Sequence, residues 1–180
     1  MKNSLKALAG AALVVFVLSL SAAAQIDNAG SFNTWTTKPF SRAHGPASES
    51  SYIKIVRAAK NASFDRVVFE FQGPVPNYRI EYLKSRIYEN ESGRHRIRLP
   101  GNVFLQLNFF VIPFDDTQEK YTDARNFVPK GNLAMRSLRS VKDETIFEGY
   151  YDFLVGMRSK VPFRVTELSN PSRLVIDFKH

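Results

Sequence analysis

The chain contains no cysteine. Disulfide bonds and thiolate metal ligands are therefore excluded, and so is the lipoprotein route of export, which needs a cysteine at the cleavage site. The three histidines, His44, His95 and His180, are far apart and show neither a Glu-x-x-His nor a His-x-His spacing. We therefore expect no metal site and no cofactor, and a fold that is stabilised by packing alone.

The longest apolar run is too short to be an ordinary membrane span. It extends from Leu8 to Leu20, about a dozen residues where a span needs roughly 20. Lys2 and Lys6 precede it, and small residues ending at Ala24 follow it. This order is typical of a secretory signal peptide and predicts cleavage after Ala24, with export to the periplasm, the cell wall or the medium. An uncleaved N-terminal membrane anchor is the alternative.

Beyond residues 1–24, the chain divides into two parts. Residues 25–51 are rich in Asn, Ser, Thr, Gly, Pro and Ala with little periodicity. This composition predicts a flexible leader, in which Trp35 and Phe40 are candidates to pin part of the segment to the domain surface. Residues 52–180 have the pattern of β-strands and are long enough for one domain with a sizeable core.

Basic residues outnumber acidic ones. The formal charge is +8, and loss of Lys2 and Lys6 with the signal peptide leaves +6. The basic residues gather in two groups, Lys84, Arg86, Arg94, His95, Arg96 and Arg98, and then Lys130, Arg136, Arg139 and Lys142. A basic exported protein encounters anionic envelope polymers, lipid head groups and muropeptide carboxylates, whereas export separates it from nucleic acid. The two groups are either contact sites for such anions or solvated faces that aid solubility.

Two segments near opposite ends of the domain echo each other, Asp65–Phe71 and Ser172–Phe178. Both alternate with a period of two, as a strand with one buried face does. The apolar faces carry Val67, Phe69 and Phe71 in the first copy and Leu174, Ile176 and Phe178 in the second. On the opposite, outward faces Arg66 and Glu70 correspond to Arg173 and Asp177. A second echo, between Val75–Tyr82 and Val161–Leu168, adjoins the first, and together they predict two similar sheets.

The strand pattern predicts an all-β fold. Roughly eight short strands separated by turn signals, without a long helical pattern, favour an antiparallel β-sandwich of two similar, roughly four-stranded sheets. Val103–Ile112 is nearly all apolar and predicts a central strand. Thr145–Met157 also reads as a strand, in which Gly149 and Gly156 mark bulges or close backbone approaches. Residues 113–143 are weakly periodic, and within them Leu133–Val141 fits either a short helix or an irregular edge strand.

Four ordered motifs resemble the AMIN-like branch of the AMIN domain family. They are Phe64–Phe71, Gly73–Tyr82, Phe147–Gly149, and Pro162–Val165 with Asn170–Phe178. The resemblance covers about residues 52–178 and implies an exported bacterial β-sandwich. In the better-known members, AMIN domains are attached to cell-wall amidases and outer-membrane secretins, where they bind peptidoglycan and localise the machine. No catalytic domain follows here, so we expect this chain either to localise an envelope protein partner or to bind wall polymer itself.

The resemblance suggests which residues contact peptidoglycan or another anionic envelope polymer. Arg66 and Arg173, beside Glu70 and Asp177, are carried over from the strand motif of the family. Local pattern adds four more candidates, Tyr78, Arg79, Tyr150 and Arg164. Arginine suits stem-peptide carboxylates through its two-pronged guanidinium, and tyrosine offers a ring face and a hydroxyl. The structural alternative is that these groups form cross-strand ion pairs on a solvated sheet face, each contributing about 0.2–1 kcal/mol.

The sequence predicts no enzyme. It contains no Gly-x-Ser-x-Gly, cysteine nucleophile or Ser-x-x-Lys. Asp115 with Asp116 reads as turn chemistry, and Glu148 with Asp152 as the solvent face of a strand, rather than as the acid and base of a glycosidase. Two other functions stay open: a β-barrel carrier of a small apolar ligand lined by some of the 15 phenylalanines, and a protein-protein interaction module without wall binding. The oligomeric state is likewise open, because an unpaired sheet edge permits dimerisation.

Overall fold

The computed structural model describes residues 32–45, 51–90, 93–110, 114–115, 120–121, 128–147 and 150–180. Within these ranges no helix is long and apolar enough to span a membrane. The predicted signal peptide lies outside the described residues and stays a prediction.

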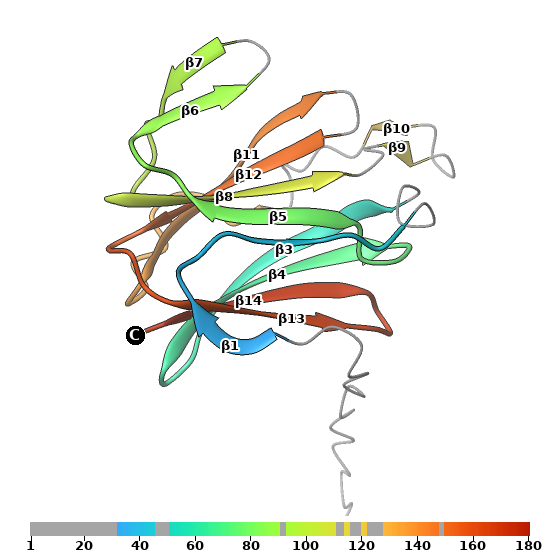
Figure 1. Ribbon diagram of the computed structural model, residues 1–180, viewed down its shortest axis with the longest axis horizontal. Helices are drawn as coiled ribbons and strands as arrows, with labels where there is room; N and C mark the ends of the chain where they lie inside the picture. The colour runs from blue at the N-terminus through green and yellow to red at the C-terminus, as the bar shows by residue number, and fades with distance from the viewer. Residues whose placement is uncertain are drawn as a thin grey trace, which may run out of the picture.

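Two five-stranded antiparallel sheets pack against each other (Figure 1). Sheet A contains, in spatial order, β1 (Phe32–Thr36), β13 (Phe163–Leu168), β14 (Arg173–Lys179), β4 (Phe64–Gln72) and β3 (Tyr52–Lys60). Sheet B contains β11 (Leu138–Phe147), β12 (Tyr150–Met157), β8 (Val103–Phe110), β5 (Asn77–Tyr82) and β2 (Phe40–Arg42). The arrangement confirms the predicted β-sandwich, with β8 in the centre of its sheet.

Each sheet has one strand more than the pattern from residue 52 onward predicts. The extra strands, β1 and β2, belong to the segment expected to be a flexible leader. In β1, Thr36 lies opposite Phe163, and in β2, Phe40 lies opposite Ile80 and packs against the core. Because these short strands pair with the outer edges of β13 and β5, they satisfy backbone groups that would otherwise be open.

The two echoing segments are neighbours in one sheet and do not occupy equivalent places in two sheets. β4 and β14 pair directly, with Val67 opposite Ile176 and Phe69 opposite Leu174. All four side chains are buried, as the alternation predicts. The expectation of one echo per sheet was therefore wrong, because the same alternation suits any strand with one face on the core, whichever sheet it joins.

Aromatic side chains fill the space between the sheets. The ring of Phe69 on sheet A lies 5.1 Å from that of Phe109 and 5.0 Å from that of Phe153 on sheet B. Such tilted and edge-to-face contacts are favourable aromatic geometries. Phe104 belongs to a separate apolar cluster on the other side of sheet B. The interior is thus occupied by side chains in the place where a barrel-type carrier would hold its ligand.

Sheet B ends in a long hairpin of β11 and β12. Leu133–Val141 therefore contains no helix; β11 begins at Leu138, and the preceding residues are irregular. The stretch expected as one strand, Thr145–Met157, spans parts of both hairpin strands. Gly156 is a close approach, as predicted, because an added Cβ would overlap the carbonyl oxygen of Pro100 and the hydroxyl of Ser140. Gly149 lies outside the described residues.

A second hairpin, β6 (Ile87–Asn90) with β7 (Gly93–Arg96), lies over the outer face of sheet B (Figure 1). It is held by a small apolar cluster separate from the main core: Tyr88, Ile97, Phe104 and Leu154, with Leu83 and Leu99 at its border. Two very short strands, β9 (Phe114–Asp115) and β10 (Lys120–Tyr121), form a further pair. One part of the outer face of sheet B is therefore covered, and another part is open.

Candidate functional site

The residues taken from the strand motif meet on the outer face of sheet A. Asp177 accepts hydrogen bonds from two arginines. Arg66 Nε lies 2.6 Å from Oδ1, and Arg164 Nε lies 2.9 Å from Oδ2. The carboxylate is only 1% exposed, so the expectation of a solvated face was wrong for this residue. Two long side chains cover it because β4 and β13 flank β14.

Aromatic rings complete this arginine cluster. The guanidinium of Arg164 lies between two rings, 4.8 Å from the centre of Trp35 and 5.2 Å from that of Phe64. Arg66 stacks over Phe64 as well, at 5.0 Å. Trp35 thus fixes part of the segment expected as a leader to the domain surface. Both guanidinium groups therefore already contact a carboxylate and aromatic rings of the protein itself.

The remaining motif residues are also engaged with protein groups. Glu70 pairs with Arg57 on the neighbouring strand, with Nη2 2.5 Å from Oε2. Arg173 Nε donates to the carbonyl oxygen of Pro171 at 3.1 Å. The Arg57–Glu70 pair is a cross-strand contact of the kind that the structural alternative describes, whereas Arg173 makes a local contact with the turn before β14.

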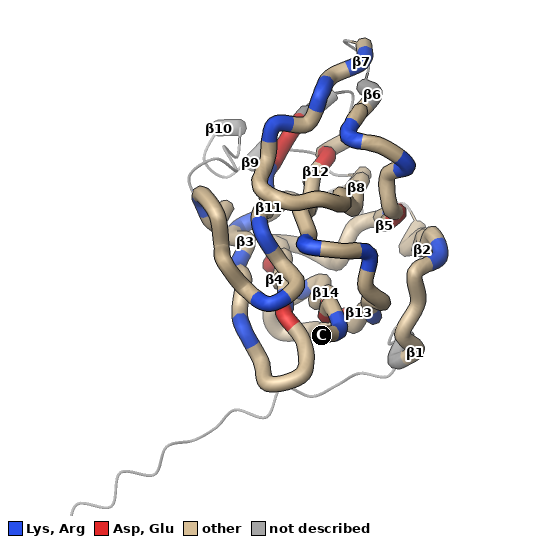
Figure 2. The backbone as a smooth tube through the Cα atoms, turned by 90° about the vertical axis from the view of Figure 1, so that its left-hand side faces the viewer, with Lys and Arg blue, Asp and Glu red and all other residues tan. Residues whose placement is uncertain are grey.

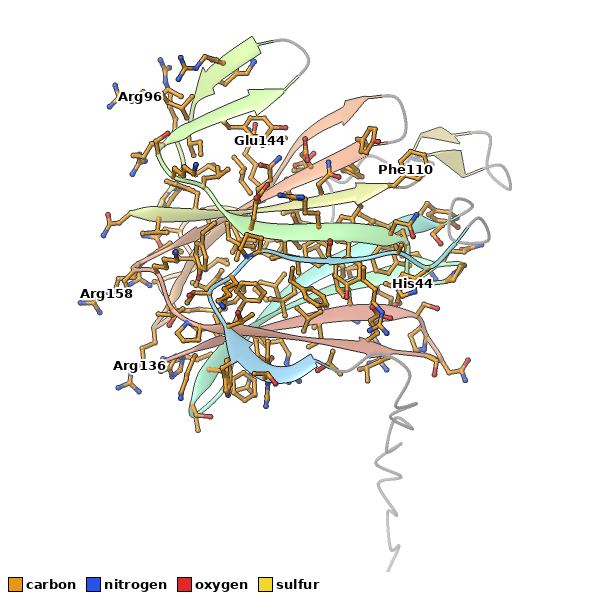
Figure 3. The ribbon with its side chains drawn as sticks, in the orientation of Figure 1. His44, Arg96, Phe110, Arg136, Glu144 and Arg158 are labelled. Atoms are coloured by element: carbon orange, nitrogen blue, oxygen red, sulfur yellow. The ribbon has the colours of Figure 1, made fainter. Side chains whose placement is uncertain are left out.

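The other three candidate residues come together on sheet B, at the end where β5, β8 and β12 meet. They line a groove of about 350 Å³ formed by Arg42, Asn77, Tyr78, Arg79, Asn108, Phe110 and Tyr150. We call it the aromatic groove. Asn77, Phe110 and Tyr150 form one row across three strands, and Arg79 and Asn108 form part of the next row. Figure 3 shows Phe110 at this end of the sandwich.

One wall of the groove is an aromatic pair in which Tyr150 is exposed and Phe110 is partly buried. The rings of Phe110 and Tyr150 lie 5.2 Å apart at 66° to each other. Tyr150 is 50% exposed, so its ring is accessible to a ligand. Opposite it, Arg79 is held by Glu81, with two hydrogen bonds of 3.1 and 3.0 Å. The groove thus presents a ring surface next to an oriented guanidinium.

The floor of the groove is tied to sheet A. The Tyr78 hydroxyl donates to Glu167 Oε1 at 2.8 Å, and the same oxygen lies 3.2 Å from His44 Nε2 and 3.6 Å from Arg42 Nε. Burial, and secondarily the negative charge of Glu167, raise the pKa of Tyr78 well above the ordinary value for a phenol. Tyr78 therefore remains neutral and acts as a structural link between the sheets beneath the groove.

A buried carboxylate lies beside the groove. Asp152 is 8% exposed and accepts hydrogen bonds from the Tyr88 hydroxyl at 2.5 Å, Asn108 Nδ2 at 2.8 Å and Gln106 Nε2 at 3.3 Å. The expected solvent-facing position of Asp152 was wrong because the β6–β7 hairpin covers it. Glu148, its suggested acid-base partner, lies outside the described residues.

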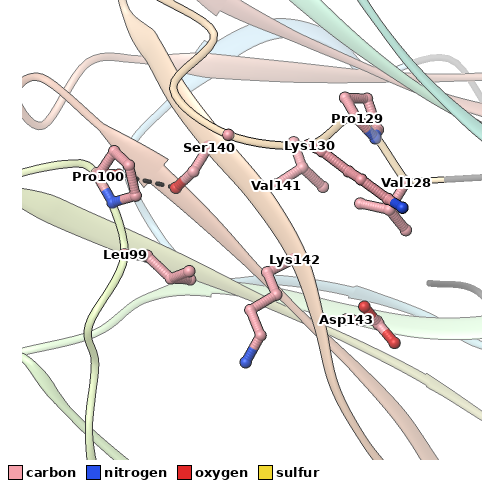
Figure 4. Close-up of a pocket in the computed structure, with 10 residues that line it drawn as sticks. Leu99, Pro100, Val128, Pro129, Lys130, Ser140, Val141, Lys142 and Asp143 are labelled. Atoms are coloured by element: carbon pink, nitrogen blue, oxygen red, sulfur yellow. Dashed lines mark hydrogen bonds between the residues drawn. The ribbon is translucent and has the colours of Figure 1, made fainter.

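A second hollow lies along β11, the edge strand of sheet B (Figure 4). Its apolar lining comes from Leu99, Val128 and Val141, and Ser140 Oγ donates to the Pro100 carbonyl oxygen at 2.7 Å beside it. Its volume is about 270 Å³, whereas ligand pockets usually span about 300–1,000 Å³. This hollow is a weaker candidate than the aromatic groove because it offers fewer oriented polar groups.

Sequence reasoning missed four residues of the aromatic groove: Arg42, Asn77, Asn108 and Phe110. Arg42 left no signal, because it belongs to the segment expected as a flexible leader and reaches the groove only through pairing of β2 with β5. Asn108 left a signal, because it interrupts an otherwise apolar central strand. Asn77 and Phe110 left none, because only pairing of β5, β8 and β12 brings them into one row. Among the residues that the structure describes, no group of three or more His, Asp or Glu side chains is placed to hold a metal ion.

Comparison with curated proteins found no match to this chain, and comparison with solved structures found none either. A family profile described as the AMIN-like domain matches residues 51–180, which is most of the chain. This match confirms the resemblance of the strand motifs and indicates a non-catalytic domain associated with the cell envelope. The protein belongs to the AMIN-like domain family.

Proposed function

We propose that this chain is an exported, non-catalytic domain that binds the glycan strands of peptidoglycan through the aromatic groove. The observation that carries the proposal is the Tyr150–Phe110 pair, in which the ring of Tyr150 is half exposed next to Arg79 and Asn108. An exported location rests on the predicted signal peptide. The envelope association of the family supports the choice of a wall polymer as ligand.

The groove offers the groups that an N-acetylated sugar requires. The Tyr150 ring supplies an apolar surface for one face of a sugar ring, and its hydroxyl supplies a donor and an acceptor. The amides of Asn77 and Asn108 lie along the same groove, where sugar hydroxyls and N-acetyl groups need polar partners. Arg79, already oriented by Glu81, suits a muropeptide carboxylate at the edge of the glycan.

The arginine cluster of sheet A is a less suitable wall site. Its central anion already accepts from Arg66 and Arg164, and both guanidinium groups lie over aromatic rings. A ligand carboxylate would have to displace Asp177 or share its cations. We therefore assign Arg66, Arg164 and Asp177 to stability and the aromatic groove to binding.

Co-sedimentation with purified sacculi tests this function. The protein should be retained above a basic control protein of similar charge across a salt series, because ring contacts persist when Coulomb attraction is screened. Tyr150→Ala should weaken retention. The matched control is Ile87→Ala, which truncates another large exposed apolar residue, 39% exposed, on the β6–β7 hairpin. Retention that falls in parallel with the basic control protein would refute wall binding through the groove.

A further inference from the structure

One end of the sandwich is lined with cations. Six separate segments meet there: the β3–β4 turn, the β5–β6 and β7–β8 connections, the residues before β11, the β12–β13 loop and the end of β14. We call this surface the basic end. Its exposed cations are Lys60, Lys84, Arg86, Arg98, Arg136, Arg158, Lys160 and Lys179. Figure 2 views this end face-on and shows Lys and Arg in segments throughout it, and Figure 3 shows Arg96, Arg158 and Arg136 along the same side.

The turns that form this end carry no acidic residue of their own, although Glu144 lies beside them, where it lines a hollow with Arg98 and pairs with Lys142 at 2.9 Å. The turn segments 58–64, 82–88, 94–103, 128–142, 156–166 and 178–180 contain neither Asp nor Glu. Asp65, which directly follows the β3–β4 turn, is 0% exposed and accepts from the backbone amides of Ser137 and Leu138 at 2.6 and 3.0 Å. Its charge is thus turned inward, where it holds the start of β11. The basic end therefore presents a mainly positive field to its surroundings.

Some of these cations shape the surface and others are available to a partner. Arg86 is held by the carbonyl oxygens of Gly101 at 2.7 Å and Leu99 at 3.2 Å. In contrast, the side chains of Lys60, Arg136 and Arg158 make no hydrogen bond or ion pair within the part of the chain that the structure describes. An exposed cation without an internal partner keeps its full attraction for an external anion.

We propose that the basic end docks on a bilayer that contains anionic phospholipids. The cations come from segments of both sheets and are spread over a surface. This distribution matches the head groups of a bilayer, which also cover a surface, better than the phosphates of a linear polymer, which lie along a line. Flexible Lys and Arg side chains suit mobile phosphate groups, and each one near an anionic bilayer adds to its attraction. The aromatic groove opens toward the opposite end of the sandwich, where Phe110 lies in Figure 3. Membrane docking therefore leaves the groove accessible and does not rest on the proposed function.

Vesicle co-sedimentation tests this inference. The protein should bind vesicles of phosphatidylcholine with phosphatidylglycerol and should not bind vesicles of phosphatidylcholine alone. The test variant is R136Q/R158Q, and the matched control is K54Q/R57Q, which removes the same charge from exposed positions of the edge strand β3. Loss of two surface-facing cations should reduce the partition coefficient roughly 25-fold at about 0.15 M salt. The control should change it by less than about threefold, since Arg57 and Lys54 lie three and six residues along β3 from Lys60, about 10 and 20 Å away, and the Debye length at that salt is about 8 Å.

Two outcomes would overturn the inference: no preference for phosphatidylglycerol, or an equal loss in both double variants, which would reduce the effect to net charge. A third arm uses inorganic polyphosphate as a soluble polymer. If polyphosphate binds more tightly than vesicles and depends on the same two arginines, the partner is a linear polyanion and not a bilayer. Sacculus binding is measured on the same variants, so failure of membrane docking and failure of wall binding remain distinguishable.

Discussion

Arg66 and Asp177 lie directly opposite each other on β4 and β14 and form a two-pronged ion pair, with Nε 2.6 Å from Oδ1 and Nη2 3.0 Å from Oδ2. Arg164 reaches the same carboxylate from β13. Three neighbouring strands of sheet A are thus joined around one buried anion. A carboxylate shared by two arginines keeps one cationic partner when the other is removed.

Removal of the arginines should therefore be strongly non-additive. Arg66→Ala or Arg164→Ala alone should lower the free energy of unfolding by about 1 kcal/mol, because the remaining guanidinium still pairs with Asp177. The double variant leaves a buried carboxylate without a cation and should lose about 3–5 kcal/mol. Urea unfolding measures all three values. Arg57→Ala, which breaks an exposed pair, is the control and should cost less than about 1 kcal/mol. Simple additivity would contradict the shared-anion geometry.

Stability should decline in alkali because two tyrosines are buried neutral. Burial raises the pKa of Tyr82 from 10.0 to about 12, and the pKa of Tyr78 is raised as well. Above pH 10 the unfolded chain releases phenolic protons that the folded chain retains. The contribution of the two neutral tyrosines to stability is therefore complete below about pH 10 and is lost as the pH rises toward 12. Each retained proton contributes a slope of about −1.4 kcal/mol per pH unit.

Urea unfolding between about pH 9 and pH 11 measures this slope. Tyr82→Phe should reduce it by the contribution of one proton, although the variant also loses the 2.6 Å hydrogen bond to the Val161 carbonyl oxygen. A change in the slope of the free energy of unfolding against pH reports the titration of Tyr82. Simple destabilisation by loss of the hydrogen bond would lower the free energy of unfolding at every pH and leave the slope unchanged. An unchanged slope in the variant would show that Tyr82 ionises equally in both states.

Gly156→Ala should destabilise the fold by about 1–3 kcal/mol or more. The added methyl would overlap Pro100 O and Ser140 Oγ, and the first of these is backbone that cannot rotate away. Gly131→Ala is the control, because its Cβ would meet nothing within 4 Å and its cost of about 1 kcal/mol arises from the positive φ alone. Thermal unfolding compares the two, and equal losses would argue against the close approach.

Tyr150→Ala should weaken binding to sacculi by about tenfold or more, as loss of a central aromatic contact often does. Tyr150→Phe should retain most of the affinity if the ring face is the main contact. The free energy of unfolding should change little in either variant, since half of the side chain is exposed. Unaltered sedimentation of the Ala variant would move the wall site away from the aromatic groove.

The local pattern of the sequence was sufficient to predict the class of fold. The period of two in Phe64–Phe71 and Arg173–Phe178 identified the core-facing side chains correctly, although Val175 and Asp177 on the opposite face of the second segment are buried as well, and the motifs there identified the family. Both features are carried by residues close together in the chain. A strand with alternating side chains has one face for the core whatever its neighbours are, so these predictions needed no knowledge of the pairing.

The burial of outward-facing residues and the formation of the groove depend on contacts between residues far apart in the chain, so only the tertiary structure could show them. Pairing of β14 with β4 and β13 placed Asp177 beneath two arginines, and the β6–β7 hairpin buried Asp152. The same long-range pairing gathered Asn77, Phe110 and Tyr150 into the aromatic groove. The alternation of side chains along a strand predicts which side faces away from the core. It does not predict what covers that side. The choice of neighbouring strand and the hairpin that folds across it depend on packing over the whole chain, and these decided which outward residues are buried and which can meet a ligand.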